Sequence, residues 1–238
     1  MANTLFMRLE SPLQSWGENS QWSERRTAPE PTKSGIVGLL ACALGWGDDE
    51  RIGALSRRVR IGVRGDLVGT LAPLRDYHTV GGGYAEPQLL TAKGEPKLSG
   101  GKPHTEPTWR YYLCDASFLA AVQADDQTIA QLAHALQFPV FPFFLGRKSC
   151  VPTRPPFDGV GDYTSIEDAL EKHPARFLEG ERVDATVKYP RLVIECNAGE
   201  GVRRRDQLVS RAYRLFEPRY AREQKKENPL QVELIKEE

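Results

Sequence analysis

The chain has 238 residues, enough to bury a sizeable core as one large domain. Its 32 Lys and Arg residues balance 32 Asp and Glu residues, so overall charge gives no support for nucleic-acid binding, and any such argument must rest on local clusters. No apolar run approaches the ~18 residues of a membrane span and no signal peptide is evident, so the sequence predicts a soluble cytoplasmic protein.

The first elements expected along the chain are a strand, a turn and a loop. Residues 4–9 alternate imperfectly between apolar and polar side chains, which predicts a strand. Proline and glycine within residues 11–17 indicate a turn, and the polar composition of residues 18–31 indicates a loop.

An almost wholly apolar helix follows this loop. Either Thr32 or Ser34 can cap its first N–H groups, and Gly45 ends it. Three small residues spaced three apart form a smooth stripe that we expect to pack on a sheet: Gly35, Gly38 and Ala41. Because the helix carries so few polar side chains, it must lie at the centre of the fold.

The next segments predict two strands and a protruding arm. Residues 59–63 and 67–71 are strand candidates joined around Gly65 and Asp66. The arm, residues 79–108, contains many glycines and four prolines but few core-forming side chains. A connection of this length without packing of its own is usually functional or disordered, so we expect a projecting hairpin here.

The second half of the chain predicts further strands and short helices. A long strand is expected over 109–122, followed by a short helix over 128–136 that Asp126 caps. The remaining expected elements are a helical turn over 166–172, strands over 183–187 and 191–196, and a frayed charged tail beyond Lys225.

Together these elements predict an α+β fold. Their order resembles a ferredoxin-like, RNA-recognition-type antiparallel sheet with a protruding β-hairpin and additional C-terminal strands. We expect one domain over residues 1–238, with 79–108 as an inserted arm and 139–222 as a β-rich C-terminal extension.

The most informative segment is residues 141–156, an apolar strand-like run that ends in Gly146 and continues with cations and prolines. The glycine lets another backbone approach closely, and the prolines hold the following chain extended. Because aromatic rings stack on bases and cations neutralise phosphates, Arg147 and Lys148 are the strongest candidates for contact with single-stranded RNA. A surface ion-pair role is their alternative. The three phenylalanines of this segment are interpreted as core residues rather than stacking platforms.

Side chains around the turn and the helix start are further RNA candidates. Exposed N–H groups, a hydroxyl and an ammonium at Lys33 and Ser34 suit a phosphate, whereas plain capping with Lys33 in solvent is the alternative. Trp16 is either a stacking platform for a base or a lid on the core. Gln14 either reads a base edge or completes a turn.

Positive charge also gathers elsewhere in the chain. The remaining candidates for RNA contact are Arg25, Arg26, Ser149, Arg154 and the triplet Arg203, Arg204 and Arg205, which we expect on a loop. Such segregation gives a neutral protein one basic face, although ordinary solvated surface is the alternative for each cluster.

The sequence predicts neither a cofactor nor a metal site. Its four cysteines are far apart, form no CxxC pair and have no histidine at ligand spacing: Cys42, Cys114, Cys150 and Cys196. They are interpreted as reduced and mostly buried.

Five motifs in a fixed order carry a family resemblance. They occupy residues 9–17, 31–40, 75–80, 111–118 and 145–150. In this order and at this spacing, the chain resembles the CRISPR-associated CasD family of the type I-E Cascade surveillance complex. The match spans roughly residues 3 to 220, and although each motif is modest, the ordered set is specific.

This resemblance implies a noncatalytic subunit that caps the CRISPR RNA (crRNA) at its 5′ end in antiviral defence. Members of that family hold the 5′ handle of the crRNA, touch the CasC backbone subunit through a projecting thumb, and contact the large CasA subunit. By position the arm is the thumb, and Arg203 to Arg205 are also candidates for CasA contact. The thumb candidates for partner binding are Tyr84, Leu89, Leu90, Lys93 and Lys97. Target DNA is reached indirectly, through pairing with the guide.

A metal-independent endoribonuclease acting on repeat RNA is the alternative function. Such cleavage needs a general base for a 2′-hydroxyl and a cation for the phosphate, and the chain offers these types at Tyr77, His78, Lys102 and His104. Two of the four lie in the arm, and nothing in the sequence fixes their geometry against the others. In the resembled systems a separate subunit, CasE, does the cutting, so we expect no catalysis here.

Overall fold

The computed structural model describes residues 2–17, 23–67, 74–82, 89–178, 190–225 and 231–235. Its helices are α1 (Lys33–Ala43), α2 (Asp49–Arg58), α3 (Asp126–Gln137) and α4 (Ile166–Lys172). Its strands are β1 (Thr4–Gln14), β2 (Trp16–Gly17), β3 (Glu24–Arg25), β4 (Thr27–Ala28), β5 (Arg60–Leu67), β6 (Leu74–Gly81), β7 (Leu98–Ser99), β8 (Lys102–Pro103), β9 (Thr105–Gln123), β10 (Phe157–Gly161), β11 (Ala175–Leu178), β12 (Arg191–Cys196), β13 (Val202–Ser210), β14 (Leu215–Lys225) and β15 (Val232–Ile235). None of the described helices is long and apolar enough to cross a membrane.

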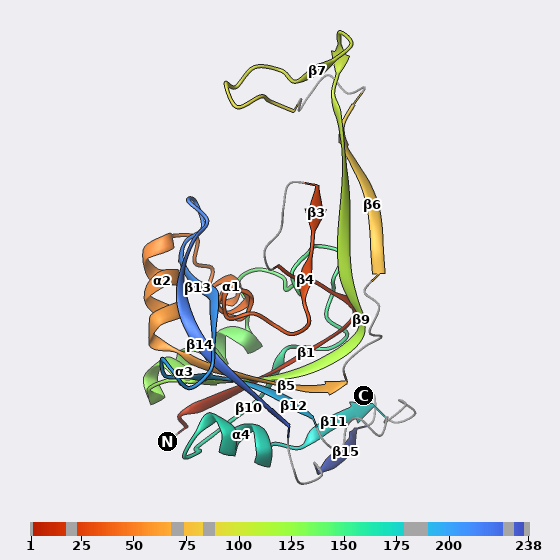
Figure 1. The fold of residues 1–238 in the computed structure, drawn as a ribbon. Coiled ribbons are helices and arrows are strands. Elements are labelled where there is room, and N and C mark those ends of the chain that lie inside the picture. The colour runs from red at the N-terminus through yellow and green to blue at the C-terminus, as the bar shows by residue number, and fades with distance from the viewer. Residues whose placement is uncertain are drawn as a thin grey trace.

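One antiparallel sheet organises the body of the molecule (Figure 1). Its strands follow the order β10-β1-β9-β5-β12-β14-β13, and every neighbouring pair is antiparallel. The 19-residue strand β9 serves two parts of the molecule. Its second half pairs with β1 and β5 in the body, whereas its first half pairs with β6 from Leu74↔Tyr112 to Gly81↔Thr105. Figure 1 shows β6 and this part of β9 rising away from the body toward β7.

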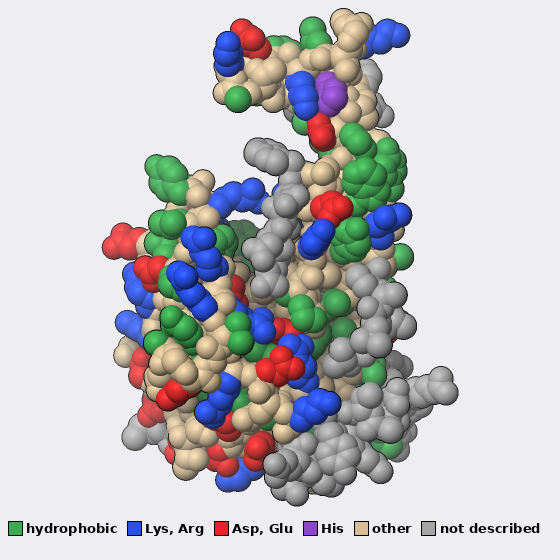
Figure 2. Space-filling view, viewed as in Figure 1, with side chains coloured by type: hydrophobic (Ala, Val, Ile, Leu, Met, Phe, Trp, Pro, Cys, Tyr) green, Lys and Arg blue, Asp and Glu red, His purple; other side chains and the backbone are tan. Residues whose placement is uncertain are grey.

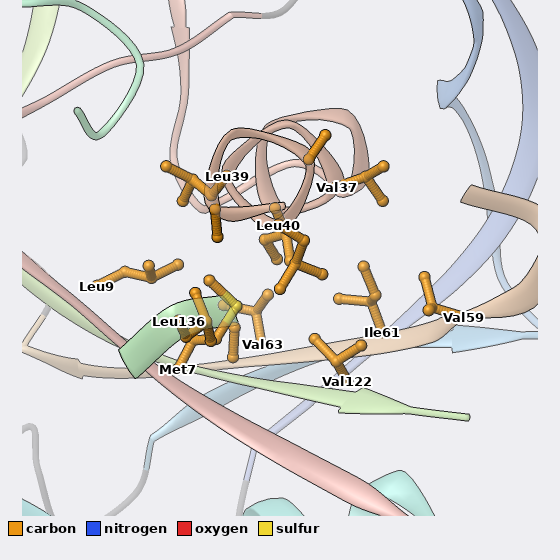
Figure 3. Packing of buried hydrophobic residues seen from close by; sticks show 14 of the residues in the cluster. Met7, Leu9, Val37, Leu39, Leu40, Val59, Ile61, Val63, Val122 and Leu136 are labelled. Carbon is orange, nitrogen blue, oxygen red and sulfur yellow. The ribbon is translucent and has the colours of Figure 1, made fainter. Parts of the chain in front are cut away.

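Alternation along β1 divides the core between the two faces of the sheet. Met7 and Leu9 point to the face that α1 and α3 cover, where they join Leu40 and Leu136 (Figure 3). Phe6 points to the opposite face and belongs to a second cluster, which includes the buried residues of α4. The sheet is therefore a middle layer with apolar side chains on both sides, and the fold is mixed α/β with a dominant antiparallel sheet.

The first residues of the helices are capped by side chains of the predicted kind, but at partly different positions. Thr32, not Ser34, caps α1, since its side chain accepts a hydrogen bond from the helix backbone. Asp125 caps α3 in the same way, so the prediction that Asp126 caps this helix is wrong by one residue. Helix α2 was not predicted from the sequence. Asp48 caps it, because its side chain accepts a hydrogen bond from the backbone N–H of Arg51.

The small-residue stripe of α1 does not pack on the sheet, contrary to expectation. Leu40 and its large apolar neighbours take that face because they bury more area (Figure 3). Gly35 instead touches the ring of Trp16, where an added Cβ would come within 2.8 Å of a ring carbon. Gly38 is exposed and has no neighbour within 4 Å of such a Cβ. The stripe faces a cavity described below.

The expected strand in residues 141–156 does not form. Residues 138–156 are all described and contain neither helix nor strand. Five prolines in this stretch remove ladder donors, and Gly146 has a φ of +102°, which an extended strand does not adopt.

Other expectations have mixed outcomes. The helix over 166–172 and the strand over 191–196 are confirmed. Gly65 and Asp66 do not form a turn, because both lie inside β5. The tail beyond Lys225 is not frayed throughout, since β15 pairs in parallel with β11. The expected strand over 183–187 and most of the strand expected over 67–71 lie outside the described residues.

The four cysteines are free, as expected. Cys150 is fully buried and the other three are partly buried.

Candidate nucleic-acid interface

The loop at residues 145–150 is fixed against the end of β1. Ser15 donates its backbone N–H to the carbonyl oxygen of Leu145 at 3.0 Å. A Cβ at Gly146 would lie 1.7 Å from the carbonyl oxygen of Ser15, so only glycine fits between the two backbones. The close backbone approach expected at this glycine is therefore made to Ser15.

Arg147 joins three segments that are far apart in the sequence. Its guanidinium donates to the carbonyl oxygens of Tyr111 (3.3 Å) and Arg25 (2.9 Å). It also lies over the Tyr112 ring, 4.5 Å from the centroid. No carboxylate among the described residues forms an ion pair with it. Arg147 is thus held in place by neutral partners, and no described carboxylate offsets its charge.

Four arginines meet around this point in a cavity of about 370 Å³. We call it the arginine pocket, and its lining is Ser15, Gly17, Arg25, Arg26, Arg110, Gly146 and Arg147. Arg26 is paired with Glu24 at 2.8 Å on the exposed side. Arg110 was missed in the sequence, because a lone cation within a long aromatic strand forms no cluster. Only the packing of β9 against β3 and the 145–150 loop adds it to the others.

A larger, mostly apolar cavity of about 750 Å³ adjoins the arginine pocket. We call it the aromatic pocket. Five aromatic residues line it: Trp16, Trp46, Phe141, Phe144 and Phe216. Its other lining residues are Ser15, Gly17, Thr32, Ser34, Gly35, Gly38, Leu39, Ala41, Cys42, Gly47, Ile52, Pro142, Gly146, Lys148, Leu208 and Arg211. Ser15, Gly17 and Gly146 line both cavities, which therefore adjoin each other.

A third cavity, of about 530 Å³, is also lined by Arg147. We call it the histidine pocket, and it is lined by Leu13, Leu74, Asp76, His78, Arg110, Tyr112, Arg147, Lys148 and Ser149. His78 Nε2 and Asp76 Oδ2 are 2.5 Å apart. Arg110 and Arg147 line both this cavity and the arginine pocket, so the two cavities are neighbours.

Trp16 and Gln14 have core roles rather than RNA-contacting ones. The Trp16 side chain is 1% exposed, and its indole N–H donates to the Gln14 amide oxygen at 3.0 Å. The Gln14 amide nitrogen donates to the carbonyl oxygens of Leu9 and Ala116. Because these polar atoms have internal partners and the side chains are buried, the predicted base contacts are corrected to a core lid and its hydrogen-bonding partner.

Lys33 is buried in an ion pair. It is therefore neither a phosphate ligand nor a solvent-exposed side chain, which were the two interpretations from the sequence. Its side chain is 1% exposed, and Nζ donates to Glu195 at 2.8 Å and to the carbonyl oxygen of Val59 at 3.0 Å. Burial lowers the pKa of the Lys33 ammonium below its usual value, and the charge of Glu195 offsets part of this. The predicted phosphate contact of Lys33 is therefore wrong, since its charge is already engaged. Ser34, half-buried, remains at the edge of the aromatic pocket.

Arg154 is likewise engaged inside the protein. Its Nη2 donates to Glu10 and to the carbonyl oxygen of Arg176, each at 2.7 Å. Glu10 also accepts from Ser117, on the sheet face opposite α1. Arg154 therefore stabilises this face, and the structure does not bring it to the loop at 145–150.

The arginine triplet lies on strand β13 and not on a loop, which corrects the prediction. Alternation along the strand leaves Arg203 and Arg205 exposed, whereas Arg204 turns to the other side and binds the buried Glu30 at 2.5 Å. Figure 2 shows Lys and Arg side chains gathered over β13 and β14 on the visible face. Neither exposed arginine lines any of the three cavities.

The phenylalanines of the 141–156 segment have different environments. Phe143 packs against the main core, as expected. Phe141 is 53% exposed and Phe144 is half-buried, and both line the aromatic pocket. The core prediction is therefore wrong for Phe141, which the surrounding prolines hold outside the sheet.

The side chains considered for catalysis do not meet in one cavity. His78 faces the histidine pocket, but neither Lys102 nor His104 lines it. His104 instead pairs with Glu106 at 3.0 Å. Tyr77 packs edge-on against the Trp109 ring. Within the described residues, no cluster of His, Cys, Asp and Glu is arranged to hold a metal ion.

The arm presents the predicted partner-binding side chains to different degrees. Leu90 is 59% exposed and Lys93 is exposed, whereas Lys97 is half-buried and paired with Glu106 at 2.8 Å. Leu89 is half-buried and lies over Gly81. Tyr84 lies outside the described residues.

Comparison with known proteins assigns a family to this architecture. The family model described as CRISPR-associated protein (Cas_Cas5) matches residues 4–229. The chain belongs to the Cas5 family of CRISPR-associated proteins. This Cas5-family protein is 36% identical over 182 residues to the CRISPR system Cascade subunit CasD of Escherichia coli (strain K12), covering 71% of this chain and 76% of that protein. The family resemblance inferred from the ordered motifs is confirmed.

Solved structures agree with this assignment. The Cas5-family protein matches a chain of a CRISPR RNA-guided surveillance complex with a TM-score of 0.71 and 31% identity, covering 95% of this chain and 91% of that one. It also matches a crystal structure of a Cas protein with a TM-score of 0.65 and 33% identity, covering 95% of both chains.

Proposed function

We propose that this Cas5-family protein is a noncatalytic RNA-binding subunit of a CRISPR RNA-guided surveillance complex. In this proposal it holds the 5′ handle of the crRNA and contributes to antiviral defence. The arginine pocket carries the proposal, because four arginines line it while the protein as a whole has no net charge. The kinship with a Cascade subunit supports the same assignment.

The proposed mechanism is geometric and electrostatic. Phosphates of a single strand enter the arginine pocket, where guanidinium forks donate charge-assisted hydrogen bonds. Arg147 holds its neighbours in place through the carbonyl groups of Arg25 and Tyr111, so the charges are arranged before RNA arrives. A pre-arranged site loses less conformational entropy on binding, and it fixes where the guide begins relative to the complex.

The proposed core is ferredoxin-like. The strand order β10-β1-β9-β5, with α1 between β1 and β5 and α3 between β9 and β10 along the chain, supports this description.

In the proposal the arm acts as a thumb on the CasC subunit, supported by the exposure of Leu90 and Lys93. The exposed Arg203 and Arg205 on β13 are proposed to contact the CasA subunit. Replacing residues 81–106 by a short turn should leave a folded core but lower the yield of complex with CasC, and normal yield would count against the thumb.

Removing single arginines tests the RNA-binding proposal. Arg110→Ala should weaken binding of a labelled RNA with the sequence of the crRNA 5′ end, and it should make the slope of log K against log salt shallower by about 0.7. Arg57→Ala removes an exposed arginine on α2 that lines none of the cavities, so it serves as the matched control. Equal affinities and slopes for both variants would overturn the proposal.

One observation favours a second candidate, a metal-independent endoribonuclease. The Asp76–His78 pair faces a pocket that also holds Arg110, Arg147 and Lys148, which are the residue types for proton transfer and phosphate binding. Incubating the protein with labelled repeat RNA in EDTA separates the candidates. Specific scission that His78→Ala abolishes would establish the enzyme, whereas intact bound RNA favours the noncatalytic subunit.

A further inference from the structure

A buried carboxylate, Glu30, joins the start of the chain to the strands near its end. The Glu30 side chain is 4% exposed, and its two oxygens accept hydrogen bonds from two different strands. Arg191 of β12 donates to Oε2 at 2.7 Å, and Arg204 of β13 donates to Oε1 at 2.5 Å. These partners are 161 and 174 positions away in the sequence, so only the tertiary structure brings the three side chains together.

The two arginines are themselves held on the main sheet. Arg191 also forms an ion pair with Glu223 of β14, and β14 lies between β12 and β13. Arg204 is half-buried and turns away from the exposed arginines on either side of it. Three neighbouring strands therefore take part in holding the Glu30 carboxylate.

The segment that precedes Glu30, residues 23–28, is held by short pairings. Among the described residues it forms only the two-residue strands β3 and β4, which pair with β9 and β2 (Figure 1). Its other contacts include a hydrogen bond from the backbone N–H of Trp16 to Thr27 and the contact with Arg147 described above. Isolated strand pairs of this length are marginally stable. Glu30 joins the end of this segment to one end of the main sheet.

This segment carries positive charge into the proposed RNA site. Arg25 and Arg26 both line the arginine pocket, and they lie shortly before Glu30 in the chain. Charge-assisted hydrogen bonds to phosphate need a donor–acceptor distance of about 2.7–2.9 Å, and a binding constellation must be held to within about 0.5 Å. Glu30 itself lines none of the three cavities, so any effect that it has on bound RNA acts through its neighbours.

Stability alone does not explain why charges are buried here. Taking an ion pair out of water costs about as much free energy as the attraction supplies, and apolar side chains of similar size often stabilise a protein equally well. The best-attested use of such buried polar groups is to fix one register of packing. We infer that Glu30 is a positioning residue, which sets the place of residues 23–28 and thereby the place of Arg25 and Arg26 in the arginine pocket. The inference rests on the proposed RNA-binding function and deepens it.

A double-mutant cycle tests the inference. Glu30→Gln keeps the size of the side chain but removes the charge that holds its two arginine partners. The second change is Arg25→Ala together with Arg26→Ala. Labelled RNA with the sequence of the crRNA 5′ end is titrated at several salt concentrations, at a temperature where every variant is folded. Lys33→Ala is the matched control, because it removes a buried ion pair between α1 and β12 that does not hold residues 23–28.

The expected result is a loss that depends on the two arginines. Glu30→Gln should weaken RNA binding about 10-fold and make the salt slope shallower by about 0.7 to 1.4, as for one or two lost phosphate contacts. With Arg25 and Arg26 already replaced by alanine, it should lose nothing further, because the groups that it positions are absent. Lys33→Ala should keep both affinity and slope. If Glu30→Gln gives no normal thermal melt, Arg204→Gln replaces it, since this milder change keeps the pair between Glu30 and its other partner.

Three results would overturn the inference. The first is that Glu30→Gln leaves affinity and slope unchanged while the alanine pair weakens binding, which would make Glu30 a purely stabilising residue. The second is that the two losses multiply in the combined variant, and the third is an equal loss for Lys33→Ala. Failure of the RNA-binding proposal itself looks different, because Arg110→Ala and the alanine pair at Arg25 and Arg26 would then also leave affinity and salt dependence unchanged.

Discussion

Arg147 and Lys148 are adjacent cations, and the structure predicts that removing each has a different consequence. Arg147 makes two hydrogen bonds to carbonyl oxygens and one contact with the Tyr112 ring, whereas Lys148 is exposed. Arg147→Ala should therefore destabilise the fold and weaken RNA binding. Lys148→Ala should affect only RNA binding.

The contacts that each substitution removes set the expected loss in free energy of unfolding. The shorter hydrogen bond of Arg147 contributes about 1.5 kcal/mol, the longer one less, and the cation–π contact about 0.5–1 kcal/mol. The expected loss is about 2–3 kcal/mol for Arg147→Ala and within about 0.5 kcal/mol of zero for Lys148→Ala. For a chain of this size the first corresponds to a decrease in Tm of roughly 4–12 °C.

Thermal unfolding and RNA titration at several salt concentrations measure the two effects separately. Below its Tm, Arg147→Ala should bind the crRNA 5′ segment more weakly and with a shallower salt slope, and the double variant should show both changes further enlarged. Arg147→Lys, which keeps the charge but loses the fork geometry, should recover the slope without recovering the full Tm. An unchanged Tm for Arg147→Ala would refute its role in joining the three segments, and unchanged affinity in both single variants and the double variant would refute the site.

Three further outcomes are expected. Gly146→Ala should prevent normal folding of the 145–150 loop and abolish RNA binding, because the added Cβ would overlap a backbone carbonyl group; a soluble variant with unmodified affinity would contradict this. Lys33→Ala should lower the free energy of unfolding by about 3–5 kcal/mol, because Glu195 loses its ion-pair partner. The RNA affinity of the folded protein should not change. Urea titration measures the first effect, and an RNA-binding assay measures the second. Burial alone would raise the pKa of Asp158, but the hydrogen bond with His173 and nearby positive charge hold it below its usual value. Its stabilising contribution is therefore present above pH ~4 and lost as pH falls further, so Asp158→Asn should flatten the acid-unfolding curve below pH ~4; an unaltered curve would rule this out.

Much of the fold followed from local pattern. Alternating or apolar runs located β1, β9 and β12, and an almost wholly apolar stretch behind a capping threonine located α1. The glycine- and proline-rich composition of residues 79–108 marked a segment outside the core. These features are local, because period, capping and breaker residues act within a few positions of one another.

The site was only partly visible in the sequence. The composition of the 145–150 loop indicated a cationic contact point, and its glycine indicated a close backbone approach. Lys33 and Arg154 carry a positive charge as Arg147 does, yet they form ion pairs with Glu195 and Glu10, which lie far away in the sequence. No local pattern distinguishes a cation with a distant carboxylate partner from one without.

The sequence by itself therefore determined where the main strands and the central helix lie and which family the chain belongs to. Each of these follows from residues that are close together along the chain. Tertiary structure alone decided which charges remain unpaired and which rings remain uncovered. It brought Arg110 from β9 beside Arg25 and Arg147, and it turned Gly38 toward a cavity instead of the sheet. The physical reason is that burial and ion pairing depend on distances through space, which the register of β9 and the packing of α1 set.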